Sequence, residues 1–216
     1  MAVDSIFRIA SMTKPMVSVA AMMLAEEGRL VDGAPVADYI PEFGALTVGV
    51  ERRPAQRVMT VQDLMRHTSG FTYGFVQRTA IDAEYRRLRI AEPDLEGGLP
   101  EMMRRLATLP LEFTPGTAFN YSVSTDVLGH VVEIASGMDL RGFFQTRLLQ
   151  PLGMADTDFF VPEDRRERLA TCYWSKDDRL ALWDDGVKTM RYASLPPLLS
   201  GGVGLAGTAA DYLRFA

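Results

Sequence analysis

The sequence is poor in the residues that form disulfides and metal sites: it has one cysteine, Cys172, and two histidines, His67 and His130. A single cysteine closes no disulfide within the chain, and a packed thiol is the simplest interpretation. No C-x-x-C or H-E-x-x-H pattern is present. We therefore expect no zinc site, no other metal and no cofactor.

Long apolar and long basic runs are also missing. No segment is apolar over the length that a membrane helix needs, and the N-terminus MAVDSIF lacks the features of a signal peptide. The net charge of −5 gives no electrostatic footprint for nucleic acid or for an anionic membrane. With 47% hydrophobic residues, the chain has material for one substantial core. We expect a cytoplasmic globular protein that binds neither nucleic acid nor membrane.

The segment from Phe7 to Gly28 places a serine and a lysine one helical turn apart, at Ser11 and Lys14. Residues i and i+3 are neighbours on one helix face, so the hydroxyl and the amine can meet. Pro15 belongs in a first helical turn, which puts the helix start near Ser11. The unpaired amides and the macrodipole of that turn favour an oxyanion. The apolar run that follows predicts a helix buried on most sides.

This pattern has two interpretations. A buried ammonium is costly, whereas a neutral amine beside a serine is a general base that activates the hydroxyl. Alternatively, Ser11 is a helix cap and Lys14 extends its ammonium to water. Two fixed residues in four occur by chance in many chains, so S-x-x-K alone favours the second interpretation.

Thr60 to Gly70 (TVQDLMRHTSG) predicts a short helix that runs into a polar turn. Thr60 and Asp63 are spaced as an N-terminal capping pair. His67 and Ser69 invite a Ser-His catalytic couple, but residues so close in a turn rarely aim at each other, and no acid partner is placed. We expect His67 to be a hydrogen-bonded turn residue.

The remaining elements follow from periodicity and turn residues. Residues 70–110 predict a helical lid, in which Arg86, Arg87 and Arg89 form a solvated face. Residues 169–190 predict a pair of strands around a turn from Ser175 to Arg179. Gly201, Gly202 and Gly204 lack the G-K-[ST] of a phosphate loop. Smaller elements are expected as a strand at Leu46 to Val50, and as helices at Pro100 to Leu109, from Ser124 to Gly137, at Leu140 to Leu149 and from Thr208.

Together with the S-x-x-K segment, three further patterns resemble the superfamily of serine β-lactamases, penicillin-binding proteins and S-x-x-K esterases, most closely its class C-like carboxylesterase branch. The resemblance implies one domain over residues 1–216 with an α+β, β-lactamase/DD-peptidase-like fold. It also implies truncation at both ends, which would make the chain helix-rich because N-terminal and C-terminal strands of the sheet are missing. The matching residues are Pro115, Gly116, Phe119, Tyr121 and Ser122, then Leu128, Gly129, Val132, Glu133, Ser136 and Gly137, then Pro151, Leu152, Gly153, Met154 and Thr157.

The same resemblance implies a catalytic set. Ser11 would be acylated by a small ester, while Lys14 and Tyr121 would move the proton from the serine to the leaving group. Without the motif, Tyr121 would be interpreted as a core aromatic residue whose hydroxyl hydrogen-bonds to another core group. Val123 stands where a Y-x-N motif has its amide, which lowers the expectation of β-lactam or peptide chemistry and favours small esters.

One departure leaves other functions open. The superfamily's third motif, of K-T-G, H-x-G or W-G-G type, does not occur in this sequence. A missing oxyanion donor typically lowers kcat by roughly 10²–10³-fold. The alternatives are a catalytically incompetent truncated fragment or pseudoenzyme, and a β-lactamase or D-amino-acid peptidase. A homo-oligomer or a complementing chain is the partner that would supply the missing part.

Overall fold

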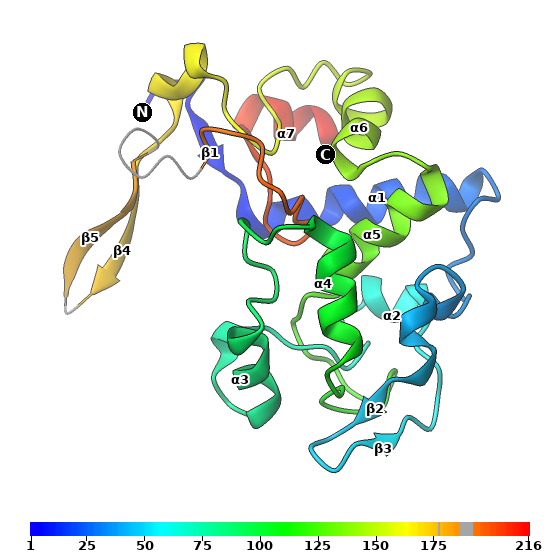
Figure 1. Cartoon of the computed structure of the whole chain (residues 1–216). Coiled ribbons are helices and arrows are strands. Elements are labelled where there is room, and N and C mark those ends of the chain that lie inside the picture. Colours follow the sequence, from blue (N-terminus) through cyan, green and yellow to red (C-terminus); the bar gives the residue numbers. More distant parts are fainter. Residues whose placement is uncertain (177, 186–191) are drawn as a thin grey trace.

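Two central helices organise the computed structural model, which describes residues 1–176, 178–185 and 192–216. Helices α1 (Thr13–Glu26) and α5 (Ser124–Ser136) lie side by side, and the smaller helices surround them (Figure 1). The other elements are β1 (Ile6–Arg8), η1 (Ala10–Met12), η2 (Val36–Asp38), η3 (Pro41–Ala45), β2 (Thr47–Val48), β3 (Arg53–Pro54), α2 (Val61–Met65), η4 (Gly74–Val76), α3 (Ala80–Arg87), α4 (Gly98–Ala107), α6 (Leu140–Phe144), η5 (Gln145–Leu149), η6 (Glu163–Arg168), β4 (Cys172–Lys176), β5 (Arg179–Asp184), β6 (Ala206–Thr208) and α7 (Ala209–Phe215).

Helix α1 is buried over most of its circumference, as expected, and only a narrow stripe of positions is exposed. Val19 and Met22 in this stripe are 38% and 45% exposed. The apolar run allows burial on any side of the helix. Helix α5 covers one face of α1, and no described element covers the stripe with Val19 and Met22 to the same extent. The buried positions are Thr13, Lys14, Met16, Val17, Ala20, Ala21 and Leu24.

The main core surrounds α5, which packs against α1, α2, α4 and α6. Helix α5 buries Val127, Leu128 and Val131 completely, which matches the helical spacing in the sequence. Phe144 of α6 stacks on Phe159, with 5.9 Å between the ring centroids. Gly137 adopts a left-handed conformation and ends α5, as expected for a C-terminal glycine. This packing holds α5, and the loop before it, against α1.

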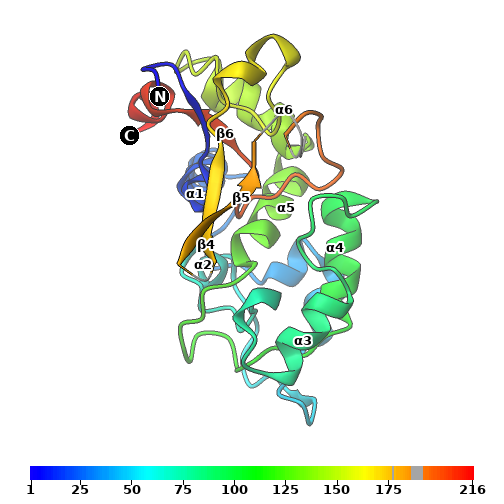
Figure 2. The ribbon, with the colours of Figure 1, turned by 90° about the vertical axis from the view of Figure 1, so that its left-hand side faces the viewer.

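Short strands join regions that are far apart in the sequence. Strand β1 pairs antiparallel with β6, with Ile6 opposite Thr208. Strands β4 and β5 form a hairpin that extends away from the helices in Figure 1 and lies in front of them in Figure 2. The hairpin confirms the expected strand pair, but its turn is tighter than Ser175 to Arg179 because β4 continues to Lys176. Residues 186–191 of the expected pair lie outside the described residues.

The predicted helix start in the second segment is confirmed. Thr60 and Asp63 form both hydrogen bonds of a capping box at α2. The predicted strand at Leu46 to Val50 is shorter, because only Thr47–Val48 pairs with β3. Residues 70–110 contain η4, α3 and α4, whereas the lid function stays a prediction. None of the helices in the described ranges is long and apolar enough to span a membrane.

Candidate active site

Ser11 lies in the single turn η1, between strand β1 and helix α1, and its side chain is exposed. Ala10 immediately before it has a φ of 46°, a left-handed conformation that a non-glycine residue adopts only at a cost. The helix itself begins at Thr13, two residues after Ser11. The strained turn therefore presents the hydroxyl to solvent at the positive end of the α1 dipole.

The structure brings together the side chains that the sequence singled out. Lys14 Nζ donates a hydrogen bond to Ser11 Oγ at 3.3 Å. Tyr121 OH lies 2.5 Å from the same oxygen. The Lys14 ammonium also lies 4.7 Å from the centre of the Tyr121 ring. Ser11 Oγ therefore has an amine and a phenol within reach, which is the arrangement that proton transfer from a nucleophile requires.

Lys14 is held by a backbone carbonyl that the sequence did not point to. Its side chain is buried, and Nζ donates to Gly202 O at 2.7 Å. The loop around Gly202 is fixed to the start of α1, because Ile9 N donates to Leu205 O at 3.0 Å and Leu205 N donates to Thr13 Oγ1 at 3.2 Å. The ammonium thus points along a defined direction toward Ser11 instead of extending to water, contrary to the alternative interpretation of Lys14.

Tyr121 lies on the loop before α5, among aromatic rings. Its ring centroid is 4.9 Å from that of His67 and 5.5 Å from that of Tyr73. Its hydroxyl donates to Ser11 Oγ and not to a core group. The alternative interpretation, a core aromatic residue whose hydroxyl bonds within the core, was therefore wrong. Neighbouring Val123 is completely buried, and Asn120 Nδ2 donates to the Phe71 carbonyl. No side-chain amide from this segment faces Ser11.

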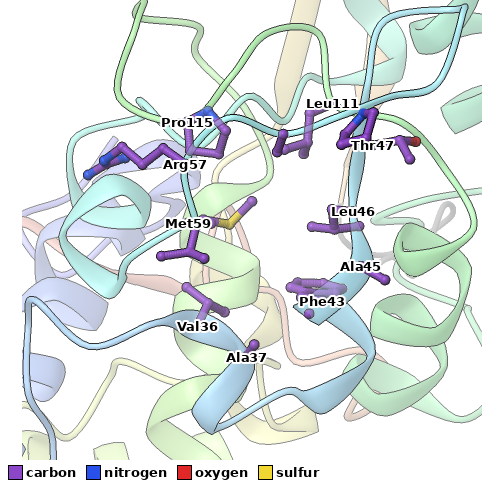
Figure 3. A pocket seen from close by; sticks show the side chains of 14 residues that line it. Val36, Ala37, Phe43, Ala45, Leu46, Thr47, Arg57, Met59, Leu111 and Pro115 are labelled. Carbon is purple, nitrogen blue, oxygen red and sulfur yellow. The ribbon is translucent and has the colours of Figure 1, made fainter.

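One hollow lies beside the site, and a second lies away from it. One is a groove beside Tyr121, lined by Phe75, Val76, Arg78, Phe119 and Asn120. The other is a cavity of about 330 Å³ between η2, η3, β2 and the segment before α2 (Figure 3). Figure 3 shows apolar side chains turned toward one another around this cavity. None of the serine, lysine and tyrosine of the site lines it, so the groove is the hollow relevant to chemistry at Ser11.

His67 packs against Tyr121 and does not pair with Ser69. Its Nδ1 accepts a hydrogen bond from Ser122 N at 3.3 Å, and Ser69 Oγ instead bonds to Ser124 Oγ at 2.7 Å. These contacts confirm the expected turn residue. Burial, and second the charge of Lys14, lower the pKa of His67 to about 4. The imidazole is therefore neutral at pH 7.

This neutral histidine predicts a pH-dependent stability. The ordinary pKa is 6.5, so below pH 6.5 the unfolded chain binds a proton that the folded chain does not bind until about pH 4. We expect the free energy of unfolding to fall between these pH values by on the order of 2 kcal/mol, because partial solvent contact reduces the full effect. Urea unfolding of the wild type and of His67→Gln at pH 7.5 to 4.5 measures this slope.

A matched variant, His130→Gln, keeps His67 and should keep the slope. His130 lies on α5 with its side chain mostly buried, and its Nδ1 is 2.9 Å from Glu133 Oε2. The slope should be smaller in His67→Gln, and an equal slope in His67→Gln and wild type would assign the loss of stability to other groups.

Comparison with known proteins places the chain in a family. The family model described as Beta-lactamase matches residues 1–216. Esterase EstB of Burkholderia gladioli is 36% identical over 98% of this chain and 56% of its own length. Protein Rv1367c of Mycobacterium tuberculosis is 38% identical over 98% of this chain and 53% of its own length. This chain thus spans about half the length of these relatives.

A solved structure is similar throughout the chain. EstCE1, described as a hydrolase with promiscuous acyltransferase activity, superposes with a TM-score of 0.85 and 28% identity over 99% of this chain and 58% of its own. The helix-rich α+β architecture is therefore that of a known fold. The chain belongs to the beta-lactamase family, within the superfamily of serine hydrolases.

Proposed function

We propose that this chain carries the site of a serine hydrolase that cleaves small carboxylic esters through an acyl-enzyme on Ser11. The observation that carries the proposal is the contact of Ser11 Oγ with both Lys14 Nζ and Tyr121 OH, at 3.3 and 2.5 Å. The names of the relatives EstB and EstCE1, an esterase and a hydrolase, support it.

The first step is the attack of Ser11 Oγ on the ester carbonyl carbon. As the new C–O bond forms, the serine proton passes to Lys14, either directly or through Tyr121 OH, a step that requires Lys14 to have given up its own proton first. The carbonyl oxygen becomes an oxyanion beside the first turn of α1, where the helix dipole stabilises negative charge. Gly202 O, which accepts from Lys14, keeps the amine in line during the transfer.

The intermediate then collapses and the acyl group is removed. The bond between the carbonyl carbon and the alcohol oxygen breaks, and Tyr121 or Lys14 gives the proton to the leaving alkoxide. A water molecule attacks the acyl-enzyme and loses its proton to the same pair. The bond to Ser11 Oγ breaks, the hydroxyl regains its proton and the carboxylic acid leaves.

The surroundings favour an ester with an apolar group over a β-lactam or a peptide. Phe75 and Phe119 in the groove beside Tyr121 are 69% and 68% exposed, so they offer apolar surface to a ligand. A substrate amide would need a side-chain partner, but Val123 is buried and the Asn120 amide is already bonded to the backbone. The acyl chain therefore finds contacts, while an acylamino group finds none in this segment.

Mass spectrometry with p-nitrophenyl butyrate tests the proposal. After rapid acid quenching, the intact protein should carry the mass of one butyryl group, and peptide mapping should locate it on Ser11. p-Nitrophenol release should show turnover, whereas a chromogenic cephalosporin should be cleaved far more slowly. A folded protein without adduct and without turnover would contradict the proposal and favour the pseudoenzyme or fragment alternative.

A further inference from the structure

Gly202 links the buried lysine to a carboxyl group that has no role in the chemistry above. Its carbonyl accepts from Lys14 Nζ at 2.7 Å, and its own N–H donates to Asp126 Oδ1 at 3.0 Å. Ser200 Oγ donates to the same carboxylate oxygen at 2.5 Å. One residue thus connects the position of Asp126 to the position of the Lys14 ammonium.

The loop that carries Gly202 is wedged between α1 and α5. A Cβ atom on Gly201 would lie 2.5 Å from the Thr125 carbonyl oxygen and 3.2 Å from Val17 Cγ2. A Cβ atom on Gly202 would lie 2.6 Å from Asp126 Oδ2 and 2.9 Å from Tyr73 OH. Three of these four distances are below 3.0 Å, which real Cβ atoms essentially never show, so only glycine lets the loop approach this closely.

Asp126 is built into this contact from the first turn of α5. It is 1% exposed, and its Oδ2 has no hydrogen-bond partner among the described residues, as is also true of Tyr73 OH. Burying a polar group costs free energy unless its hydrogen bonds are satisfied, so a carboxyl group with one unpaired oxygen at this place indicates a role beyond packing. Its two accepted hydrogen bonds both go to the loop that holds Lys14.

We infer that Asp126 is a positioning residue of the Ser11 site: through Gly202 it fixes the carbonyl that holds Lys14 Nζ against Ser11 Oγ. It touches no substrate. Its effect on turnover rests on the proposed function, whereas its effect on the lysine does not.

The contact needs an acceptor at Asp126 Oδ1 for its two donors, Ser200 Oγ and Gly202 N. Burial raises the pKa of Asp126, against the opposing effects of Ser200, Gly202 and Lys14. An asparagine oxygen can accept the same two hydrogen bonds, so Asp126→Asn should keep the loop in place. Asp126→Ala leaves two buried donors without an acceptor, and the loop will move to satisfy them.

Kinetics of the two variants give the first readout. With p-nitrophenyl butyrate we expect kcat to fall about 10–100-fold in Asp126→Ala, as for a displacement of about 1 Å in a catalytic group. KM should stay within about threefold because Asp126 lies behind the site. Asp126→Asn should retain most of kcat. Asp82→Ala is the matched control for the lysine, since Asp82 is a buried carboxylate that caps α3, accepts from Arg78 N and bonds to none of Ser11, Lys14, Tyr121 and Gly202.

Lysine-selective NMR gives a readout that needs no turnover. Only Lys14, Lys176 and Lys188 contribute signals in a protein labelled with ¹³C at lysine Cε. In wild type, Asp126→Asn and Asp82→Ala, the Lys14 signal should be distinct from the other two. In Asp126→Ala it should move toward the signals of solvent-exposed lysines.

The outcomes separate the two hypotheses. An unchanged Lys14 signal and kcat in folded Asp126→Ala would overturn the inference, as would equal losses in the Asn and Ala variants. A Lys14 signal that moves in Asp126→Ala, together with no butyryl adduct on wild type, would support the positioning role and contradict the ester hydrolase proposal.

Discussion

Ser11→Ala is expected to abolish the butyryl adduct and to lower turnover of p-nitrophenyl butyrate by roughly 10³–10⁶-fold. The reason is that the acyl-enzyme route needs a nucleophilic oxygen, and removal of a nucleophile from such a set costs about this much in kcat. Lys14 Nζ and Tyr121 OH would remain in place but would have no proton to accept. Intact mass and p-nitrophenol release, recorded on the same samples, measure both effects.

Ser18→Ala serves as the matched control, because Ser18 lies on α1, seven positions after Ser11. Its turnover should stay within about twofold of wild type, since a substitution away from buried networks changes little. If Ser11→Ala kept the adduct, the acylated residue would be another one, and the proposed nucleophile would be wrong.

Tyr121→Phe is expected to lower kcat by about 10²–10⁴-fold, the range typical of a lost general acid or base. The phenol contacts Ser11 Oγ at 2.5 Å, so it stands where a proton must travel in both acylation and departure of the alcohol. The phenylalanine ring keeps the packing against His67 and Tyr73, so the fold should persist. Stopped-flow measurement of the p-nitrophenol burst separates acylation from deacylation.

Tyr39→Phe is a suitable comparison, since the Tyr39 hydroxyl accepts from Val31 N and bonds to no site residue. Its kcat should be unchanged. A folded Tyr121→Phe protein with wild-type kcat would show that Lys14 alone moves the proton.

The local part of the site could be predicted from the sequence, because it depends on neighbours. Ser11 and Lys14 are three positions apart, and a helical turn is enough to bring them together. The Thr60–Asp63 capping box is equally local. Tyr121 is 110 positions from Ser11, so its place could be expected only from the resemblance to a family.

The rest of the site depends on contacts that no periodicity encodes. Gly202 and Asp126 meet Lys14 because β6 pairs with β1 and because α5 packs on α1. Glycine in a cluster indicates close approach of the backbone, but not which partner approaches. The position of the exposed stripe with Val19 and Met22 has a related cause: an apolar run shows that a helix can be buried, and not which stripe stays exposed.

The hydrogen bond between Lys14 and Gly202 spans 188 positions of the chain, which has a consequence for biosynthesis. A ribosome adds about 5–20 residues per second, so the lysine waits roughly 10–40 s before its acceptor has been made. During that time the lysine has been made and the loop that holds it has not. Lys14 is therefore expected to align with Ser11 only after the segment around Gly202 has emerged and paired.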